Sequence, residues 1–462
     1  MIYKERYLSR IIIECVTPLV VGSGEESIMS DALVARDVNG LPYIPGTSLA
    51  GVLRHSLDKE AQELLMGYQD RDNGEGSRVV FSEAKLLDMN GIPIDGLLDT
   101  EDSKRIWSNL PIRQHVRIGH DGTAEKGGKY DQEVVPKGAR FCFEIEMMGE
   151  GDMDIQEEFF LQMLNNLSVN SFRIGGGSRS GFGKVKVVEA YYRKLNLQVK
   201  EERDMYLEKS SCLSSSWNHW EAIELKPVQN NGTIYSLKLQ PEDFFLFGSG
   251  YGNDNADMTA VRETMITWDK AGKANVVSSD QTLLIPASSV KGALSHRTAF
   301  HYNRRTGNYA DECSSLEHTG KQNRAVYELF GSEGKIDSTG ERIAATRGRV
   351  LFGDIVLKRP TAVVEKVLNH VKIDRFSGGA IAGALFSQEP FYNNREQDNN
   401  GTLTIDFEIT LLEEDCAFSE HVVEAFEDAL KDLCRGMLPL GGGVNRGNGC
   451  FIGSLLKNEK EI

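Results

Sequence analysis

Ile174-Gly-Gly-Gly-Ser-Arg-Ser-Gly-Phe-Gly183 is the stretch that decides the fold, because its glycine pattern returns near the C-terminus as Leu440-Gly-Gly-Gly-Val-Asn-Arg-Gly-Asn-Gly449. Three motifs precede each copy in the same order. In the first half they are Val20-Val-Gly-Ser-Gly24, Asp31-Ala-Leu-Val-Ala-Arg36-Asp37 and Tyr43-Ile-Pro-Gly-Thr-Ser48-Leu-Ala-Gly51. In the second half they are Phe247-Gly-Ser-Gly250, Asp257-Met-Thr-Ala-Val-Arg262-Glu263 and Ile285-Pro-Ala-Ser-Ser289-Val-Lys-Gly292. A repeated order of motifs indicates two related domains.

Outward from these motifs, each half predicts the same order of elements: strand, helix, strand, polar insertion, strand, helix and strand. The first strands are expected over 8–15 and 233–239, where β-branched residues alternate with others. Helices follow Pro45 and Pro286, where Ser and Thr offer capping oxygens. A β-α-β-β-α-β order is typical of the ferredoxin-like fold, so we predict an α+β protein with two tandem domains of this kind.

The second helix of each half has an apolar stripe at helical spacing, which predicts that one face packs on a sheet. The stripes contain Phe160, Met163, Leu164 and Leu167 in the first half, and Val423, Phe426, Leu430 and Leu433 in the second. We place the domains at 1–199 and 233–462. Residues 200–232 are expected to form a linker that is only partly loose, because leaving Trp217 and Trp220 in water is unfavourable.

The composition is that of a soluble globular protein, with 462 residues, 40% hydrophobic and 26% charged. We find no apolar run that could span a bilayer and no signal peptide layout, so a cytoplasmic location is expected. Seven cysteines without a Cys-x-x-Cys pair disfavour a disulfide framework and a zinc ribbon. The net charge of −16 is unusual for a free-standing nucleic-acid binder, but basic residues gather locally at 113–140 and 291–305.

The Gly-rich loops exclude two familiar nucleotide sites. Lys184 is not followed by the Ser or Thr that a Walker loop requires, and strands rather than helices follow both loops. A flexible connection is one interpretation. The other is close approach of the backbone to a phosphodiester, with unhindered amides and the charges of Arg179 and Arg446.

Asp31 and Asp257 are the candidate catalytic residues. An Asp after a Gly/Ser loop is commonly a turn or cap residue. Repetition beside a candidate phosphate-binding loop favours a second interpretation, in which the carboxylate holds a divalent cation or helps to remove a proton from an attacking hydroxyl.

The polar insertions also repeat. Gly122 to Glu133 aligns without a gap on Gly378 to Glu389, and Arg117 and Arg375 stand before them. A Gly-rich segment with one aromatic residue, Tyr130 or Phe386, predicts a projecting hairpin. The arginines form surface ion pairs or contact phosphate, while the aromatic side chain stacks on a base.

Together these motifs resemble the RAMP superfamily of CRISPR proteins, and most resemble the backbone subunit of type III effector complexes. The chain as a whole is similar to a fused, two-copy backbone subunit of the subtype III-D kind. The resemblance implies an RNA-recognition-like core in each domain, a groove that holds CRISPR RNA, and an inserted thumb hairpin that distorts the guide–target duplex. Two departures make the copies unequal: the shifted Arg446, and His120-Asp121 where the second hairpin has Ser377.

The resemblance further implies that Asp31 and Asp257 each cut target RNA with a divalent metal, magnesium or manganese. Expected partners are guide RNA, complementary RNA and other effector subunits. Alternatives are a non-catalytic RNA-coating subunit, an enzyme that processes precursor CRISPR RNA, and an unrelated small-molecule enzyme. We expect RNA contacts from Arg36, Ser48, Arg54, Arg117, Lys126, Tyr130, Gly175, Gly176, Gly177, Arg179, Arg262, Ser289, Lys291, Arg375, Phe386, Gly441, Gly442, Gly443 and Arg446.

Overall fold

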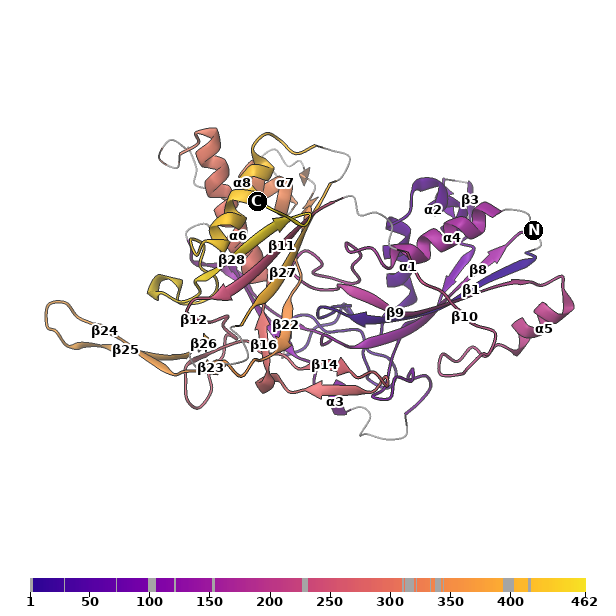
Figure 1. Ribbon diagram of the computed structural model, residues 1–462, viewed down its shortest axis with the longest axis horizontal. Helices are drawn as coiled ribbons and strands as arrows, with labels where there is room; N and C mark the ends of the chain where they lie inside the picture. The colour runs from indigo at the N-terminus through magenta and orange to yellow at the C-terminus, as the bar shows by residue number, and fades with distance from the viewer. Residues whose placement is uncertain are drawn as a thin grey trace.

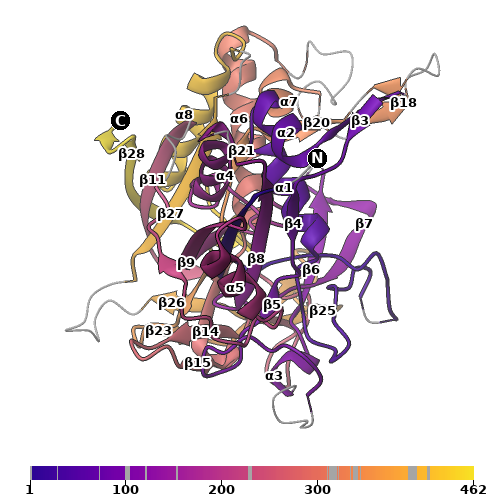
Figure 2. The same ribbon diagram turned by 90° about the vertical axis from the view of Figure 1, so that its right-hand side faces the viewer.

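Each half of the chain builds one main sheet, and the two sheets lie in adjacent lobes of the computed structural model (Figures 1 and 2). His120 and Asp121 of the first hairpin, and 227–231 of the predicted linker, lie outside the described residues. The structure describes residues 3–28, 30–71, 73–98, 105–119, 122–151, 154–226, 232–309, 311, 320, 322–332, 334–336, 342–343, 345–393, 403–413 and 417–462.

The first sheet has the strand order β10-β9-β1-β8-β4, with β5 also paired to β8. β1 lies between β8 and β9 and is antiparallel to both. Its alternating apolar residues bury one face of the strand. The strands are β1 (Glu5–Cys15), β4 (Val79–Phe81), β5 (Lys85–Leu86), β8 (Arg140–Gly149), β9 (Val185–Asn196) and β10 (Glu221–Ala222). The helices of this half include α1 (Gly46–His55), α2 (Lys59–Met66), α3 (Arg105–Ser108) and α4 (Asp154–Asn166).

The second sheet repeats this arrangement in the order β21-β27-β11-β28-β29. In both sheets the first long strand lies between the two strands that flank the last helix. The predicted α+β class is confirmed. The elements are β11 (Gly232–Pro241), α6 (Ala287–Thr306), α7 (Arg324–Phe330), β21 (Val350–Leu351), β27 (Ile405–Leu412), α8 (Val422–Cys434), β28 (Phe451–Lys457) and β29 (Lys460–Glu461).

The predicted apolar stripes form the helix side of each core. Phe160, Met163 and Leu164 on α4 are fully buried, as are Phe426 and Leu430 on α8. The prediction that Ser or Thr caps the first helices is wrong. Pro45 and Pro286 occupy the cap positions without a side-chain hydrogen bond, since a proline already fixes the backbone turn into the helix.

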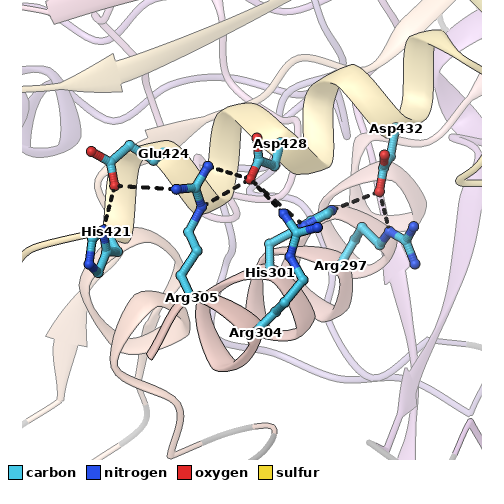
Figure 3. Close-up of polar contacts among 8 residues, drawn as sticks. All are labelled: Arg297, His301, Arg304, Arg305, His421, Glu424, Asp428 and Asp432. Carbon is cyan, nitrogen blue, oxygen red and sulfur yellow. Dashed lines mark hydrogen bonds and ion pairs between the residues drawn. The ribbon is translucent and has the colours of Figure 1, made fainter. Parts of the chain in front are cut away.

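Helices α6 and α8 are joined by a ladder of ion pairs (Figure 3). Acidic side chains on α8 are spaced four residues apart and therefore share one face of the helix. Asp428 accepts from Arg305 at 2.6 Å, and Asp432 accepts from Arg297 at 2.6 Å. The remaining members of the ladder are His301, Arg304, His421 and Glu424.

The segment after the first sheet turns back onto it. Residues 200–208 form α5 (Lys200–Glu208), and β10 pairs with β9. Trp217 is buried against Leu8 and Leu195 and stacks edge-on against Trp220. The apolar part of the predicted linker is thus packed rather than loose.

A hairpin from the second half also joins the first core. β14 (Met265–Trp268) and β15 (Ala274–Val277) carry Ile266 and Trp268 into the first hydrophobic cluster. Ile266 N donates to Lys137 O at 2.8 Å, and Trp268 Nε1 donates to Gly138 O at 2.8 Å. The two lobes are therefore held together by buried contacts as well as by the connecting segment.

Candidate nucleic-acid interface

Asp31 and Asp257 occupy matching positions at the base of two projecting hairpins. The first hairpin consists of β6 (Ile112–Ile118) and β7 (Ala124–Glu133), and the second of β24 (Leu368–Ile373) and β25 (Ala380–Glu389). Figure 1 shows the second hairpin extending away from its sheet. Asp31 Oδ2 accepts from Asp131 N at 2.8 Å, and Asp257 Oδ2 accepts from Ser387 N at 2.7 Å. Both side chains are exposed.

The backbone pairing beside each carboxylate is also the same. Ala32 forms a parallel bridge with Gln132, and Met258 pairs in parallel with Gln388. Each candidate carboxylate thus lies one residue before a residue whose backbone pairs with the hairpin. This pairing places a third chain segment beside the two strands of the hairpin. The structure brings Asp31 and Asp257 into equivalent surroundings, as the repeat predicts.

The two Gly-rich loops have one backbone conformation. The first, third, seventh and ninth residues after the leading aliphatic of each stretch are glycines that take positive φ, from +65° to +110°. Gly176 N donates to Val20 O at 2.7 Å, and Gly442 N donates to Leu246 O at 2.6 Å. These φ angles are a region that glycine enters without the strain a Cβ imposes. The positive-φ glycines are Gly175, Gly177, Gly181 and Gly183, then Gly441, Gly443, Gly447 and Gly449.

The first Gly-rich loop lies against the second half. Arg179 Nε donates to Gly348 O at 2.7 Å, and a Cβ placed on Gly181 would meet the side chains of Ala287 and Asp354. Lys291 lies one turn into α6. Burial, followed by the nearby Arg179 cation, lowers the pKa of Lys291. Cations from the two halves therefore lie at the junction between the first Gly-rich loop and α6.

Three of the other predicted arginines, Arg36, Arg54 and Arg262, are engaged in contacts within the protein. Arg36 pairs with Glu133 at 2.5 Å, at the end of the first hairpin, whereas Arg262 pairs at 2.9 Å with Glu365, which precedes the second hairpin. Arg54 donates to Met66 O and Gly67 O and ties α1 to α2. Ser48 is half-buried in α1, whereas Ser289 is exposed in α6.

The hairpin residues are mostly solvent-accessible. Arg117 lies 3.8 Å from Glu125, while Lys126 is exposed. Arg375 is exposed beside Phe376, with its guanidinium 5.1 Å from the ring centroid. Apolar side chains on the hairpins also face solvent, among them Val116, Ile118, Val371, Ile373 and Leu385.

Each hairpin carries a histidine stacked on its aromatic residue, which our reading of the sequence missed. His115 stacks on Tyr130 with ring centroids 4.6 Å apart, and His370 stacks on Phe386 at 4.8 Å. Burial, followed by the charge of Arg113, lowers the pKa of His115 to about 4. The two histidines stack on equivalent residues of the two hairpins. The gapless match between the insertions covers only the strands that follow, whereas the histidines lie on the preceding strands, each of which contains a β-bulge.

The Gly-rich loops contact these stacks. Phe182 meets His115 edge-on at 6.0 Å, and the Arg446 guanidinium lies 5.2 Å from the Phe386 ring centroid. An open hollow of about 310 Å³ lies beside the segment that follows Asp31. It is lined by Gly22, Ser23, Val34, Arg36 and Pro45, where α1 begins. The Gly-rich loops thus lie against the hairpins, and the hollow lies at the start of α1.

Among the described residues, no group of three or more His, Cys, Asp or Glu side chains is placed to hold a metal ion. Each candidate site supplies one clearly placed carboxylate, Asp31 or Asp257. Such a donor set fits magnesium, which binds one or two carboxylates and completes its shell with water and substrate phosphate. Within the same described part of the chain, no helix is long and apolar enough to cross a membrane.

Comparison with known proteins gives a consistent assignment. The chain is 28% identical over 204 residues to a CRISPR system Cms endoribonuclease Csm3 of Methanocaldococcus jannaschii, covering 40% of this chain and 79% of that protein. It is 26% identical over 210 residues to the Csm3 of Methanothermobacter thermautotrophicus, covering 40% of this chain and 85% of that protein. A matched region that takes up 40% of the chain leaves room for a second copy.

A solved structure described as the type III-B Cmr-beta apo state matches 39% of this chain and 96% of its own, at 17% identity and a TM-score of 0.32. The model of the RAMP superfamily matches residues 12–186 and 272–452, which together are most of the sequence. The chain therefore belongs to the RAMP superfamily and contains two RAMP regions in tandem.

Proposed function

We propose that this protein is a backbone subunit of a type III CRISPR effector complex that binds guide RNA and cuts complementary RNA at two places. The observation that carries the proposal is the duplicated geometry: each half sets an exposed Asp against a hairpin and beside a Gly-rich loop. We interpret each half, 1–199 and 233–462, as a ferredoxin-like domain and each hairpin as a thumb. The complex would act in the cytoplasm.

The RNA would run across the surface formed by the Gly-rich loops, the hairpin bases and the starts of α1 and α6. Glycines carry no side chain that would hinder the approach of a phosphate to the backbone, and helix starts favour anions. Arg179, Lys291 and Arg446 supply charge along this line. The acidic total of the chain is compatible with such a local path, since phosphate contact depends on the groove alone.

Replacing Lys291 with Gln tests the path. We expect RNA retention to weaken and the slope of log K against log salt to become shallower by about 0.7, because one phosphate contact is lost. Filter binding across a salt series on the guide-loaded protein measures the slope. Lys457→Gln is the matched control, since Lys457 pairs with Glu427 at 2.7 Å on the outer face, and it should leave the slope unchanged. An unchanged slope for Lys291→Gln would exclude this residue from the path.

The chemistry that the sites can support is transesterification. The ribose 2′-hydroxyl oxygen attacks the adjacent phosphorus, its proton passes to a base, and the bond to the 5′-oxygen breaks. The products are a 2′,3′-cyclic phosphate and a 5′-hydroxyl. Asp31 and Asp257 would hold a divalent metal, magnesium or manganese, which when bound stabilises charge on the phosphate oxygens. The cations of the path would add to this stabilisation.

The second site carries a prediction about pH. Hydrogen bonds from the backbone amide and then the hydroxyl of Ser387 lower the pKa of Asp257. At pH values well above this lowered pKa, the carboxylate is ionised. We therefore expect its contribution to the second cut to be constant between pH 8 and about 5. A pH series of single-turnover rates measures this. A second-site rate that falls with an apparent pKa near 6, while the first-site rate of the same complex does not, would contradict the assignment.

A non-catalytic coating subunit is the second candidate. It is favoured by one observation, namely that each carboxylate already accepts a backbone amide from its hairpin, as a structural cap does. Loading the complete complex with guide RNA and supplying a labelled complementary RNA distinguishes the two when Asp31 and Asp257 are both replaced. The proposed function requires two discrete cuts that disappear in this double variant, whereas a coating subunit leaves any cut unchanged.

A further inference from the structure

A buried arginine joins the first hairpin to the second half of the chain. Arg113 lies on β6, and its side chain is 2% exposed. Its Nε donates to Glu263 at 2.7 Å, and its Nη1 donates to Asp354. Both carboxylates belong to the second half and are at most 3% exposed. Three buried charges in mutual contact form an interaction that is strong when intact and costly to break.

The same carboxylate organises the surfaces around it. Asp354 Oδ1 accepts from Ala287 N at 2.7 Å and so caps α6, while Asp354 N donates to Gly181 O at 3.1 Å. The Arg113 guanidinium also lies 4.8 Å from the Phe182 ring centroid. The first hairpin, the first Gly-rich loop and the start of α6 are thus held at one point.

Arg113 connects to the first candidate site through two steps of strand pairing. It pairs with Gln132 across the hairpin, and Gln132 forms the bridge to Ala32, next to Asp31. A shift of β6 therefore moves β7, whose Asp131 N donates to the Asp31 carboxylate and orients it.

Among the described residues of the second half, no arginine makes a corresponding contact. Gln388 is the repeat counterpart of Gln132, and its partner across the second hairpin is Leu368, which is half-buried. The acids that correspond to Glu263 and Asp354 are Asp37 and Glu83. Asp37 accepts local backbone amides, and Glu83 pairs with Lys85 at 2.7 Å. The contact that Arg113 makes therefore occurs once, between the halves.

From this asymmetry we infer that Arg113 is a positioning residue through which the second half sets the first hairpin and with it the Asp31 site. The inference rests on the proposed function. It states that the two sites differ: the first is completed within this chain, and the second is not held in this way.

The test compares both cuts in the same guide-loaded complex. Arg113→Leu gives the first hairpin the residue that the second already has, and we expect the first product to fall about tenfold to hundredfold, because small misplacements near reacting groups have effects of that size. The second product should stay within about twofold, which shows that the variant has folded and assembled. Arg113→Lys keeps the charge and should recover much of the first product.

Arg305→Leu is the matched control, because Arg305 pairs with Asp428 and Glu424 on the outer helices and lies in neither hairpin. It should change neither product. A milder variant, Glu263→Gln, keeps the shape of the contact and should lower only the first product. Equal loss of both products in the Arg113 and Glu263 variants, or no loss in either, would overturn the inference.

Hydrogen exchange separates this inference from the proposed function. Amides of residues 112–118 and 124–133 should exchange faster in Arg113→Leu, while those of 368–373 and 380–389 should not. If the wild type makes no cut, the proposed catalysis is overturned, and exchange alone then decides whether Arg113 fixes the hairpin. If Arg113→Leu changed amide exchange equally in both hairpins, the positioning role of Arg113 would be rejected even if the wild type cuts RNA twice.

Discussion

Asp31→Asn should abolish one of two RNA products and Asp257→Asn the other, with the double variant making neither. Each rate should fall by about 10² or more, since Asn cannot hold a cation or take a proton as a carboxylate does. Asn still offers an oxygen to Asp131 N or Ser387 N, so the hairpin base keeps its hydrogen bond. The variants therefore separate catalysis from capping. Denaturing gels of an end-labelled target in the guide-loaded complex measure both products.

Asp269→Asn is the control for these variants. Asp269 accepts from Ala271 N and Lys273 N in the β14–β15 turn, so it is also an exposed capping carboxylate. It lies in neither Gly-rich loop and in neither of the two projecting hairpins. Both products should therefore remain. Two products that persist in the double variant would leave the coating function as the better description.

The second large effect concerns the closing glycine of each Gly-rich loop. Gly183 and Gly449 both have φ of +81°, and a Cβ on either would lie well inside contact distance of the carbonyl oxygen of Ile174 or Leu440. We expect Gly183→Ala and Gly449→Ala each to destabilise the protein by about 3 kcal/mol or more, from backbone strain plus a clash with immobile main chain. The melting temperature should fall by about 6–12 °C.

Gly51→Ala is the matched control. Gly51 lies inside α1, and a Cβ there has no heavy atom within 4 Å. Alanine is the better helix former, so this variant should be about 1 kcal/mol more stable. Scanning calorimetry on all three variants checks the contrast. If Gly183→Ala and Gly449→Ala melt like the wild type, the loops are not rigid elements.

Much of the fold could be predicted because its signals are local. The strand over 8–15, the helices after Pro45 and Pro286, and the stripes on α4 and α8 each depend on a short pattern of apolar residues and turns. Repetition added what one copy could not supply, since it marked Asp31 and Asp257 among many acidic residues.

The parts that could not be predicted depend on tertiary contacts. Our comparison of the insertions started at Gly122 and Gly378, so the His115 and His370 stacks on the preceding strands were missed. Nothing near Arg113 in the sequence points to Glu263, 150 residues away. The cap of α6 likewise comes from Asp354, which no local rule for helix starts would select.

The β14–β15 hairpin has a consequence for how a target would be measured. Its seat on Lys137 and Gly138, together with the bond from Lys137 Nζ to Val356 O at 2.7 Å, ties the half that carries Asp31 to the half that carries Asp257. If both cut, the fragment released between them would have one length, whatever its base sequence and however many subunits stand on either side. The protein would thereby act as a ruler whose single interval is set by main-chain hydrogen bonds.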